Sequence, residues 1–477
     1  MSVHQAPIAF ADRTRAHPGA DYAAFLAAHQ RKAVLRFITC GSVDDGKSTL
    51  IGRLLHDTKQ IFDDQIAALA QGSRRHGTQG GGIDLALLLD GLQAEREQGI
   101  TIDVAYRFFS TDARAFIVAD TPGHEQYTRN MATGASTADV AVILVDARHG
   151  LTRQTRRHAL LVSMLGIRRV ALAVNKMDLI GWSEARFAQI VSEFTAFGTK
   201  LDFSEVRAIP LSAKTGDNVV EPGLGAPWYA GGTLLAFLAT VPVREAADDA
   251  PFRMAVQWVN RPDADFRGYS GRIASGRVRP GDAITVQPGG RATTVARIHT
   301  ADGDLAEAGE GRSVTLVLAD QVDVSRGDVI AAVDRAMDVS DTLDVRLFWA
   351  SERTLTPGAA LLAKVGTTTT NARVTAIRGR IDPETAQSDP ADTLDANDIA
   401  DVTLTLDRPV AFDPYAQSRE TGSLILIDRE TTDTAALGLV RTIRSSPSGE
   451  TRETAARATR PGFFAKLRST FGRSESP

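Results

Sequence analysis

The first half of the chain carries apolar runs that predict buried β-strands, at 35–39, 116–119, 140–145, 170–174 and 206–211. These runs are continuous rather than alternating, which is typical of a parallel sheet covered on both faces. Segments with helical spacing of apolar residues separate them, for example Thr49–Leu55, Gln154–Leu165 and Trp182–Phe197. The pattern therefore predicts a doubly wound α/β domain over 35–243 with a mostly parallel sheet, whose ligands bind at the carboxyl ends of the strands.

The pattern changes after Val241-Pro242, where short alternating runs are separated by Gly/Pro turns. Strand signals lie at Met254–Val259, Gly271–Ile273, Ala283–Val286 and Val314–Leu318, and again at 343–349, 372–378, 400–406 and 423–427. Short strands at steady spacing predict two antiparallel β-barrels, at 252–336 and 341–445. We expect 382–398 to be a loop, and Ser270 to lie in a turn of the first barrel.

The two ends of the chain lie outside these domains. Residues 1–34 form an N-terminal extension with one short amphipathic pattern, at Tyr22, Phe25 and Leu26, for which we expect docking without chemistry. The tail, 446–477, is basic and rich in Ser, Thr and Arg, and we expect it to be disordered.

Composition narrows the class of protein. The 54 Lys and Arg against 58 Asp and Glu residues give a net charge of −4, which argues against nucleic acid as a general partner. The lone cysteine, Cys40, cannot form an internal disulfide and is expected to be a small buried residue. Without an 18-residue apolar run or a signal-peptide core, we expect a cytoplasmic protein with no membrane span.

The stretch from 41 to 49 fits the phosphate-binding pattern G-x-x-x-x-G-K-[ST], between a strand signal and a helix signal. Glycines let successive N–H groups converge on an anion at a helix N-terminus. Lys47 would reach the β- and γ-phosphates, and Ser48 would ligate Mg²⁺. We expect the whole stretch to bind the nucleotide: Gly41, Ser42, Val43, Asp44, Asp45, Gly46, Lys47, Ser48 and Thr49.

A second motif, Asp120-Thr-Pro-Gly-His124, follows the strand at 116–119. At a strand end, the Asp120 carboxylate can hold Mg²⁺ through water, and the Gly123 N–H can point at the γ-phosphate.

Two further strand ends specify the base. After 170–174 comes Asn175-Lys-Met-Asp178, in which Asp178 can accept both N–H donors of the guanine edge, a contact that adenine cannot make. Asn175 would tie this loop to the phosphate-binding loop and the base, and Lys176 would cover the ring. After 206–211, the backbone N–H groups of Ser212, Ala213 and Lys214 are candidates to bond guanine O6.

The segment Glu95-Arg-Glu-Gln-Gly-Ile-Thr101-Ile-Asp103 adds a resemblance to translational GTPases. The resemblance implies that Thr101 closes over Mg²⁺ and the γ-phosphate, and that 57–103 is a switch loop. It also implies that His124 orients the attacking water and that Asp44 helps to ligate a monovalent cation. Catalytic roles are thus expected for His124, Thr101 and Lys47, and metal-binding roles for Ser48, Thr101 and Asp120.

The strings 41–58, 93–103, 257–263 and 412–416 are more specific, and resemble the CysN family, the GTPase subunits of bacterial ATP sulfurylase. The resemblance covers about residues 30–445. It implies that GTP hydrolysis is coupled to formation of adenosine 5′-phosphosulfate from ATP and sulfate, in a heterodimer or larger assembly with a CysD-like catalytic adenylyltransferase subunit. In agreement, the sequence has no second Gly-Lys-[Ser/Thr] loop, no Ser-Gly-Gly-x-Asp-Ser loop and no His-x-x-His.

One alternative function belongs to a different class: an elongation-type GTPase that delivers aminoacyl-tRNA. It shares the nucleotide motifs, so residues 41–214 do not separate the two. The net negative charge and the strings 41–58 and 257–263 favour the sulfate-activating function.

Overall fold

The computed structural model describes residues 32–61, 85–88, 95, 101–243, 249–263 and 266–441. The expected N-terminal pattern at 22–26, most of the expected switch loop 57–103 and the tail 446–477 lie outside these residues.

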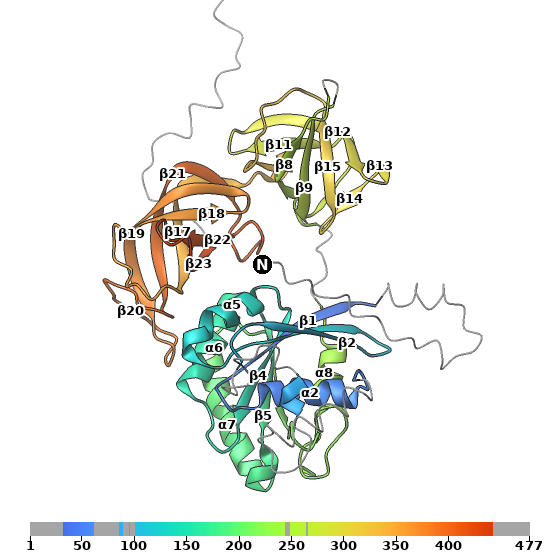
Figure 1. The fold of residues 1–477 in the computed structure, drawn as a ribbon, viewed down its shortest axis with the longest axis vertical. Coiled ribbons are helices and arrows are strands. Elements are labelled where there is room, and N and C mark those ends of the chain that lie inside the picture. The colour runs from blue at the N-terminus through green and yellow to red at the C-terminus, as the bar shows by residue number, and fades with distance from the viewer. Residues whose placement is uncertain are drawn as a thin grey trace, which may run out of the picture. The chain divides into compact units, whose positions relative to one another are not determined.

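A 6-stranded sheet forms the centre of the first domain, with the order β2-β3-β1-β4-β5-β6 (Figure 1). Its strands are β1 (Val34–Cys40), β2 (Ala105–Ser110), β3 (Ala115–Asp120), β4 (Val140–Asp146), β5 (Arg169–Asn175) and β6 (Glu205–Pro210). All neighbours are parallel except β2, which is antiparallel to β3 at the edge. The expected strands are confirmed. Strand β2 was not predicted: Arg107 interrupts its apolar residues, and Tyr106 and Phe108 are exposed at the edge of the sheet.

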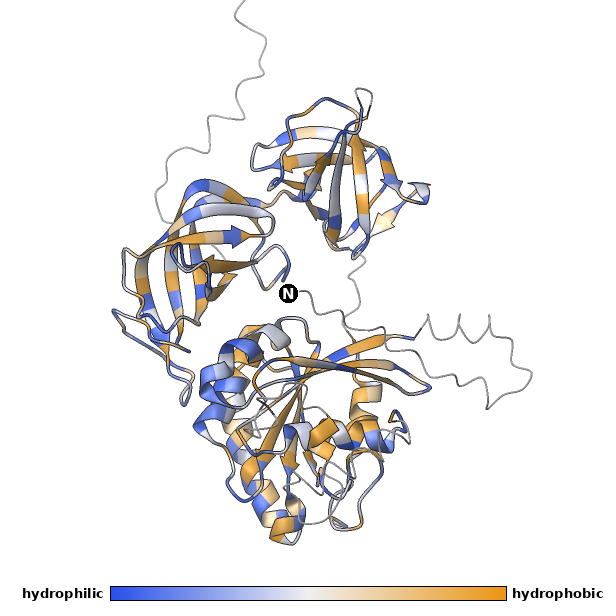
Figure 2. Ribbon diagram, in the orientation of Figure 1, coloured by the Kyte–Doolittle hydropathy of each residue, from blue (hydrophilic) through white to orange (hydrophobic). Residues whose placement is uncertain are grey.

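Helices cover both faces of this sheet. Apolar residues of α2 (Lys47–Asp57) and α8 (Leu234–Thr240) pack in the core on one face. Those of α5 (Thr128–Ser136), α6 (Arg153–Met164) and α7 (Glu184–Gly198) pack on the other. Three of these helices begin where a hydroxyl, that of Thr152, Ser183 or Thr233, accepts a backbone N–H of the first turn. Between the faces, β4 and β5 are apolar along nearly their whole length (Figure 2).

Short 3₁₀ helices complete the chain's helical elements among the described residues: η2 (Leu85–Leu88), η3 (Glu125–Tyr127), η4 (Met177–Ile180) and η5 (Val333–Arg335). The lone Cys40 ends β1 and is fully buried, as expected, and burial raises the pKa of its thiol to about 12. No helix in the described ranges is long and apolar enough to cross a membrane.

The first barrel closes through the order β11-β16-β7-β9-β15-β12, with β12 pairing back to β11. Its strands are β7 (Arg253–Ala255), β8 (Trp258–Asn260), β9 (Gly268–Ser275), β10 (Arg277–Val278), β11 (Ala283–Gln287), β12 (Arg291–Thr300), β13 (Gly303–Leu305), β14 (Ala308–Gly309), β15 (Ser313–Leu318) and β16 (Val329–Ala332). The single strand expected at Met254–Val259 is in fact two, because β7 and β8 pair with opposite ends of β9. The turn expected at Ser270 was also wrong: it lies within β9, with its hydroxyl 2.9 Å from that of Thr315.

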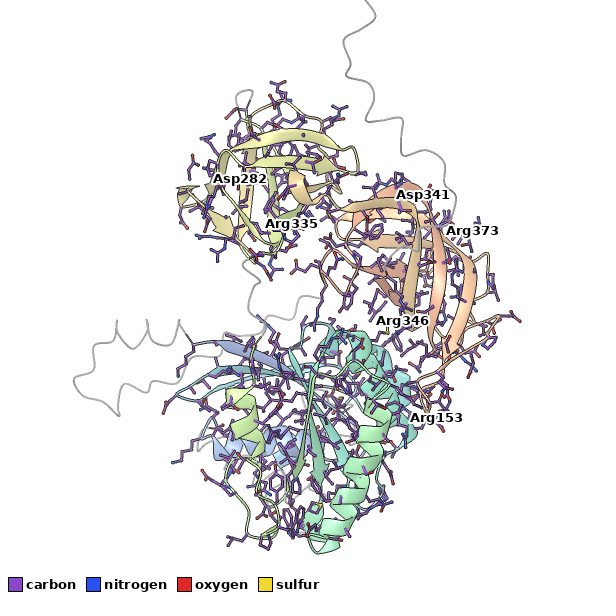
Figure 3. All side chains as sticks on the ribbon, turned by 180° about the vertical axis from the view of Figure 1, so that it is seen from behind. Arg153, Asp282, Arg335, Asp341, Arg346 and Arg373 are labelled. Atoms are coloured by element: carbon purple, nitrogen blue, oxygen red, sulfur yellow. The ribbon has the colours of Figure 1, made fainter. Side chains whose placement is uncertain are left out.

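The second barrel closes through β18-β22-β23-β17-β21-β19, with β19 pairing back to β18. Its strands are β17 (Asp338–Trp349), β18 (Ala360–Val365), β19 (Thr368–Ile381), β20 (Ser388–Asp389), β21 (Ile399–Phe412), β22 (Ser423–Ile427) and β23 (Thr434–Val440). The expected loop 382–398 contains only the two-residue strand β20. Exposed positions on the barrels carry charge, for example Asp282, Asp341 and Arg373 (Figure 3). The chain is thus an α/β domain followed by two antiparallel barrels, as predicted.

A loop after β21 connects three domains. Asp413 pairs with Arg253 of β7 through two hydrogen bonds of 3.0 and 3.1 Å. Tyr415 donates its hydroxyl to the Leu165 carbonyl at 2.9 Å, at the end of α6. Arg419 donates to the carbonyls of Ala138 and Gly166 in the α/β domain.

Candidate functional site

The phosphate-binding loop joins β1 to α2 and is held by one of its own carboxylates. Asp45 accepts the N–H of Ser42 at 2.6 Å and the N–H of Asp146, at the end of β4, at 3.3 Å. Gly46 has φ +91°, and a Cβ there would lie 2.5 Å from the Asn175 amide nitrogen. Glycine is therefore required at this position, both for the backbone conformation and for the contact with the neighbouring loop.

Lys47 is the cation at the start of α2. Its ammonium group donates to the Ser42 carbonyl at 2.7 Å and to the Gly41 carbonyl at 3.3 Å. Burial lowers the pKa of Lys47, although the nearby Asp45 and Asp120 oppose that shift. Gly123, at the end of β3, packs so closely against Lys47 and Ser42 that a side chain there would clash with both. The two glycine-containing motifs thus meet around one buried ammonium group.

Three oxygen atoms gather beside this cation. The Ser48 hydroxyl donates to Asp120 at 2.9 Å and lies 3.3 Å from the Thr101 hydroxyl. Burial raises the pKa of Asp120 to about 6, against the hydrogen bond from Ser48 and the charge of Lys47. Two hydroxyls, one carboxylate and phosphate oxygens are the set that Mg²⁺ prefers, since it uses few protein ligands. The described residues contain no cluster of three or more His, Cys, Asp or Glu side chains that could hold a metal ion.

Thr101 owes its position to two side chains that sequence reasoning missed. Glu95 accepts the N–H groups of Ile102 and Asp103 at 3.0 and 3.4 Å, and Asn130 of α5 donates to the Ile102 carbonyl at 2.7 Å. Glu95 belongs to the string that carries the family resemblance, but its spacing from Thr101 gives no local signal of this contact.

His124 follows Gly123 in the motif after β3 and lies at the start of η3. Its side chain is exposed, and its Nδ1 accepts the N–H of Gln126 at 3.3 Å. The ring of Tyr127 lies 6.1 Å away, centroid to centroid. Since Nδ1 accepts, a neutral His124 ring carries its proton on Nε2, which can then donate to a water molecule or a ligand.

The loop after β5 is tied to the phosphate-binding loop. Asn175 donates to the Asp45 carbonyl at 2.7 Å and accepts the N–H of Ala213 at 2.9 Å. Lys176 donates to the Asp44 carbonyl and pairs with Asp146 at 3.0 Å. The three strand-end motifs therefore lie together, as expected for the carboxyl edge of a parallel sheet.

Asp146 is a further carboxylate at this edge that sequence reasoning missed. Burial raises the pKa of Asp146, but hydrogen bonds from Arg148 and Lys176 outweigh it and hold the pKa well below its usual range. This ionised, paired group therefore holds the Lys176 ammonium group beside the phosphate-binding loop.

The structure assigns different surroundings to the three residues of the last motif. The Ser212 N–H donates to the Asp217 carbonyl at 3.2 Å, and the Ala213 N–H donates to Asn175. Two of the three N–H groups therefore have partners within the chain, and the contact of Ser212, Ala213 and Lys214 with guanine O6 stays a prediction. Asp178 lies in η4 and is partly exposed, so its carboxylate can reach a ligand. Val43 and Asp44 are exposed on the loop, and Thr49 lies within α2.

Comparison with known proteins assigns two parts of the chain to families. Residues 32–250 match the elongation factor Tu GTP binding domain, and residues 342–441 match the GTP-eEF1A C-terminal domain-like family. The Saccharomyces cerevisiae Ski7 GTPase-like domain, solved with GDP and inorganic phosphate, superposes with a TM-score of 0.51 over 89% of this chain and 100% of that one, at 18% identity. That likeness establishes the fold.

Sequence relatives are much closer. Sulfate adenylyltransferase subunit 1 of Methylorubrum extorquens is 68% identical over 99% of this chain and 100% of its own length. The protein of the same name from Laribacter hongkongensis is 52% identical over 92% of this chain and 91% of its own length. With an elongation factor Tu-like GTP-binding domain and two closed barrels in addition, the chain belongs to the family of sulfate adenylyltransferase subunit 1.

Proposed function

We propose that this chain is the GTPase subunit of a sulfate adenylyltransferase. It binds GTP with Mg²⁺ and hydrolyses it to GDP and phosphate. Hydrolysis drives the formation of adenosine 5′-phosphosulfate and pyrophosphate from ATP and sulfate on a separate, CysD-like catalytic subunit, in a heterodimer or larger assembly. The setting is the cytoplasm, which suits a chain whose lone cysteine is buried and reduced.

One observation carries the GTPase part of this proposal: Ser48, Thr101 and Asp120 converge beside Lys47 at the N-terminus of α2. These residues come from three separate segments of the chain. A magnesium-bound triphosphate fits them because it brings the negative charge that the buried ammonium group and the helix end favour. The coupling to sulfate activation rests on the full-length similarity to relatives of that name.

The positions of these residues support the following proposed roles. Lys47 would bind β- and γ-phosphate oxygens as a compact charge, and Ser48, Thr101 and Asp120 would hold Mg²⁺. The bound ion would neutralise negative charge that builds up on the phosphate oxygens. His124 orients the water molecule that attacks the γ-phosphate, and the Gly123 N–H donates to that group. Asp178 selects guanine, with Asn175 fixing the loop and Lys176 covering the ring.

The relatives' name, subunit 1, supports a separate catalytic subunit that binds ATP and sulfate. The single Gly-Lys-Ser loop of this chain is then the site for GTP. Formation of a sulfate–phosphate anhydride is strongly unfavourable, and GTP hydrolysis supplies the free energy.

The test is reconstitution. The chain purified with its catalytic subunit should release pyrophosphate from ATP and sulfate at a rate that rises with GTP and falls when a non-hydrolysable GTP analogue replaces it. The chain alone should hydrolyse GTP and form no adenosine 5′-phosphosulfate. Product formed by the chain alone, or by the complex equally well without GTP, would contradict the proposal.

A further inference from the structure

The first amide of the phosphate-binding loop is held by a residue that the nucleotide motifs do not include. The N–H of Gly41 donates to Nδ1 of His158 at 3.1 Å, across 117 positions of sequence. His158 lies on α6 and is fully buried. Burial lowers the pKa of His158 to about 3, so the ring is neutral at physiological pH. A charged ring could not accept this hydrogen bond.

The opposite nitrogen of the ring faces another side chain of α6. Since Nδ1 accepts, the proton of the neutral ring is on Nε2, which lies 2.8 Å from the amide nitrogen of Gln154, one helical turn earlier. The amide oxygen of Gln154 points instead to Arg157, whose guanidinium group donates to it at 3.2 Å. Two N–H donors, those of His158 and Arg157, thus lie on opposite sides of an amide that has one oxygen.

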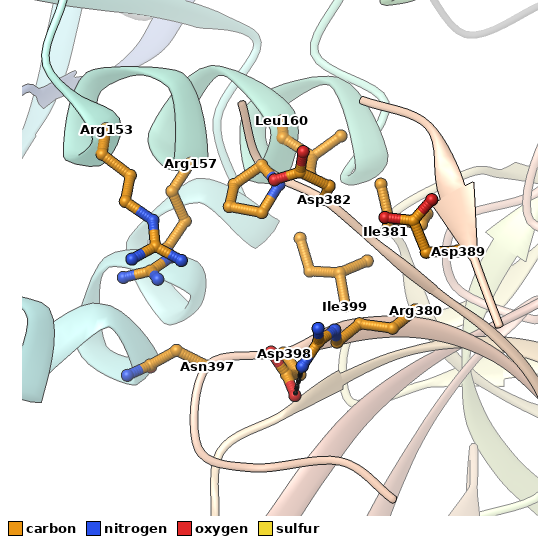
Figure 4. Close-up of a pocket in the computed structure, with 11 residues that line it drawn as sticks. Arg153, Arg157, Leu160, Arg380, Ile381, Asp382, Asp389, Asn397, Asp398 and Ile399 are labelled. Atoms are coloured by element: carbon orange, nitrogen blue, oxygen red, sulfur yellow. Dashed lines mark ion pairs between the residues drawn. The ribbon is translucent and has the colours of Figure 1, made fainter. Parts of the chain in front are cut away.

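Arg157 leads to the hydrolytic side of the site. It is buried and pairs with Glu125 at 2.5 Å, and Glu125 is the residue after His124. The Glu125 carbonyl also accepts from Thr128 at 2.7 Å and from Asn397 at 3.2 Å. Arg157 and Asn397 line a pocket of about 130 Å³, where α6 faces the loop before β21 (Figure 4). The contacts that run from Gly41 through His158, Gln154 and Arg157 therefore end at a pocket that solvent can enter.

We propose that Gln154 and His158 are positioning residues that couple Glu125, beside the water-orienting His124, to the Gly41 N–H of the phosphate-binding loop. The inference deepens the proposed function and rests on it, because it concerns the regulation of the same nucleotide site.

The coupling works through the amide of Gln154, which has two orientations related by a half-turn. When the Gln154 oxygen faces Arg157, it supports the ion pair between Arg157 and Glu125, and the Nε2–H of His158 faces the NH₂ group of Gln154. With its oxygen toward His158, the ring is held in place to accept from Gly41, and Arg157 loses that acceptor. Displacement of Glu125 therefore changes which orientation of the Gln154 amide is favoured. That change alters how firmly His158 is positioned to accept the N–H of Gly41 in the phosphate-binding loop. Two discrete arrangements are what a coupled pair of sites needs.

The experiment measures the dissociation rate of a fluorescent GDP analogue from the full-length chain with Mg²⁺. His158→Phe removes the acceptor for Gly41 and should speed dissociation roughly tenfold, the effect of one buried hydrogen bond. His158→Asn keeps an acceptor at the Nδ1 position and loses the contact with Gln154, so its rate should stay within about threefold of wild type. Equal rates for the two variants, with native circular dichroism, would overturn the role of Nδ1.

A double-mutant cycle tests the coupling. Glu125→Ala should change GDP dissociation about three- to tenfold in the wild-type background and have almost no effect in His158→Asn, because the link is already cut. Gln154→Met should abolish the Glu125 effect in the same way. The matched control, Gln189→Met on the exposed face of α7, should preserve it.

Two failures are distinguishable. If the wild-type chain binds no guanine nucleotide, the proposed function is wrong and the coupling falls with it. If it binds GDP and Glu125→Ala acts equally in all backgrounds, only the coupling is wrong.

Discussion

Among the described residues, two places that bury charge differ in how well that charge is satisfied. In the barrels, Arg253 and Asp413 form a two-point ion pair, and Asp413 also accepts from Thr421 at 2.7 Å. At the nucleotide site, burial raises the pKa of Asp45 and of Asp120 to about 6 and lowers the pKa of Lys47. The first arrangement completes its own hydrogen bonds. In the second, burial disfavours the charged forms that phosphate and Mg²⁺ would stabilise.

The difference separates structural from functional buried charge. A buried ion pair whose hydrogen bonds are completed within the protein is part of the folded structure and needs no ligand. Buried groups whose pKa values move toward the neutral form mark a place where binding supplies the missing partner, and such groups cluster at active sites. The following substitutions test this distinction, because each should mainly affect either the nucleotide site, through binding or turnover, or the stability of the fold.

The largest effect is expected for His124→Ala. GTP turnover should fall by about two to four orders of magnitude, the range of groups that position or activate water. Nucleotide affinity should remain close to wild type, and the free energy of unfolding should change by less than about 0.5 kcal/mol, because the side chain is exposed. Steady-state phosphate release and urea unfolding measure the two quantities. His299→Ala, on the first barrel, is the control, and unchanged turnover in His124→Ala would exclude the proposed role.

Asp413→Ala should lower the stability of the fold and leave GTP binding unchanged. Removing one partner leaves a buried guanidinium group unpaired, which should lower the free energy of unfolding by about 3–5 kcal/mol. GTP affinity measured below the unfolding transition should be retained. Arg253→Met combined with Asp413→Leu should recover most of the loss. The exposed pair Arg272–Glu420 is the control, since Glu420→Ala should cost at most about 1 kcal/mol.

Asp178→Asn tests the base end of the site. Loss of two charge-assisted hydrogen bonds should weaken GTP binding by about 100- to 1,000-fold and favour xanthosine triphosphate, whose edge suits an amide. Competition binding with both nucleotides gives the ratio. An unchanged preference for guanine would exclude the contact.

The smallest effect concerns acid stability. The pKa of His158 is about 3 in the fold and about 6.5 in an unfolded chain, so the unfolded state binds more protons between these values. The contribution of the neutral His158 ring to the free energy of unfolding is therefore fully present above pH 6.5. It is lost as pH falls, by about 2 kcal/mol at pH 5.

His158→Asn should remove this part of the pH dependence. The raised pKa of Asp45 acts in the opposite sense, since its contribution is lost as pH rises from about 4 to about 6. That contribution is present in both proteins and cancels in the comparison of their unfolding curves at pH 5 and 7.5. Parallel pH profiles for the two proteins would contradict the prediction.

Much of this arrangement could be predicted from local pattern. Continuous apolar runs located the parallel strands, and the order of motifs at their ends located the nucleotide site, because parallel strands bring their carboxyl ends to one edge. The individual roles of the site residues, Thr101 and His124 among them, remain predictions. The edge strand β2 and the division of 254–259 into two strands depend on pairing partners distant in sequence.

The residues that sequence reasoning missed share a physical reason. His158 and Glu95 act by accepting backbone N–H groups, which every residue except proline possesses, so no particular partner residue marks the contact in the sequence. Asn130 likewise binds a carbonyl group. Contacts of this kind become visible only when the chain is folded.

The loop at 413–421 has a consequence for anyone who wishes to recombine this chain with its relatives. Asp413 belongs to the contact with the first barrel, whereas Tyr415 and Arg419 fit backbone carbonyls of the α/β domain. A chimaera that exchanges only the second barrel would replace both sets of contacts at once. Crossover points chosen at domain boundaries would therefore succeed only if this whole loop is transplanted together with the surfaces it touches.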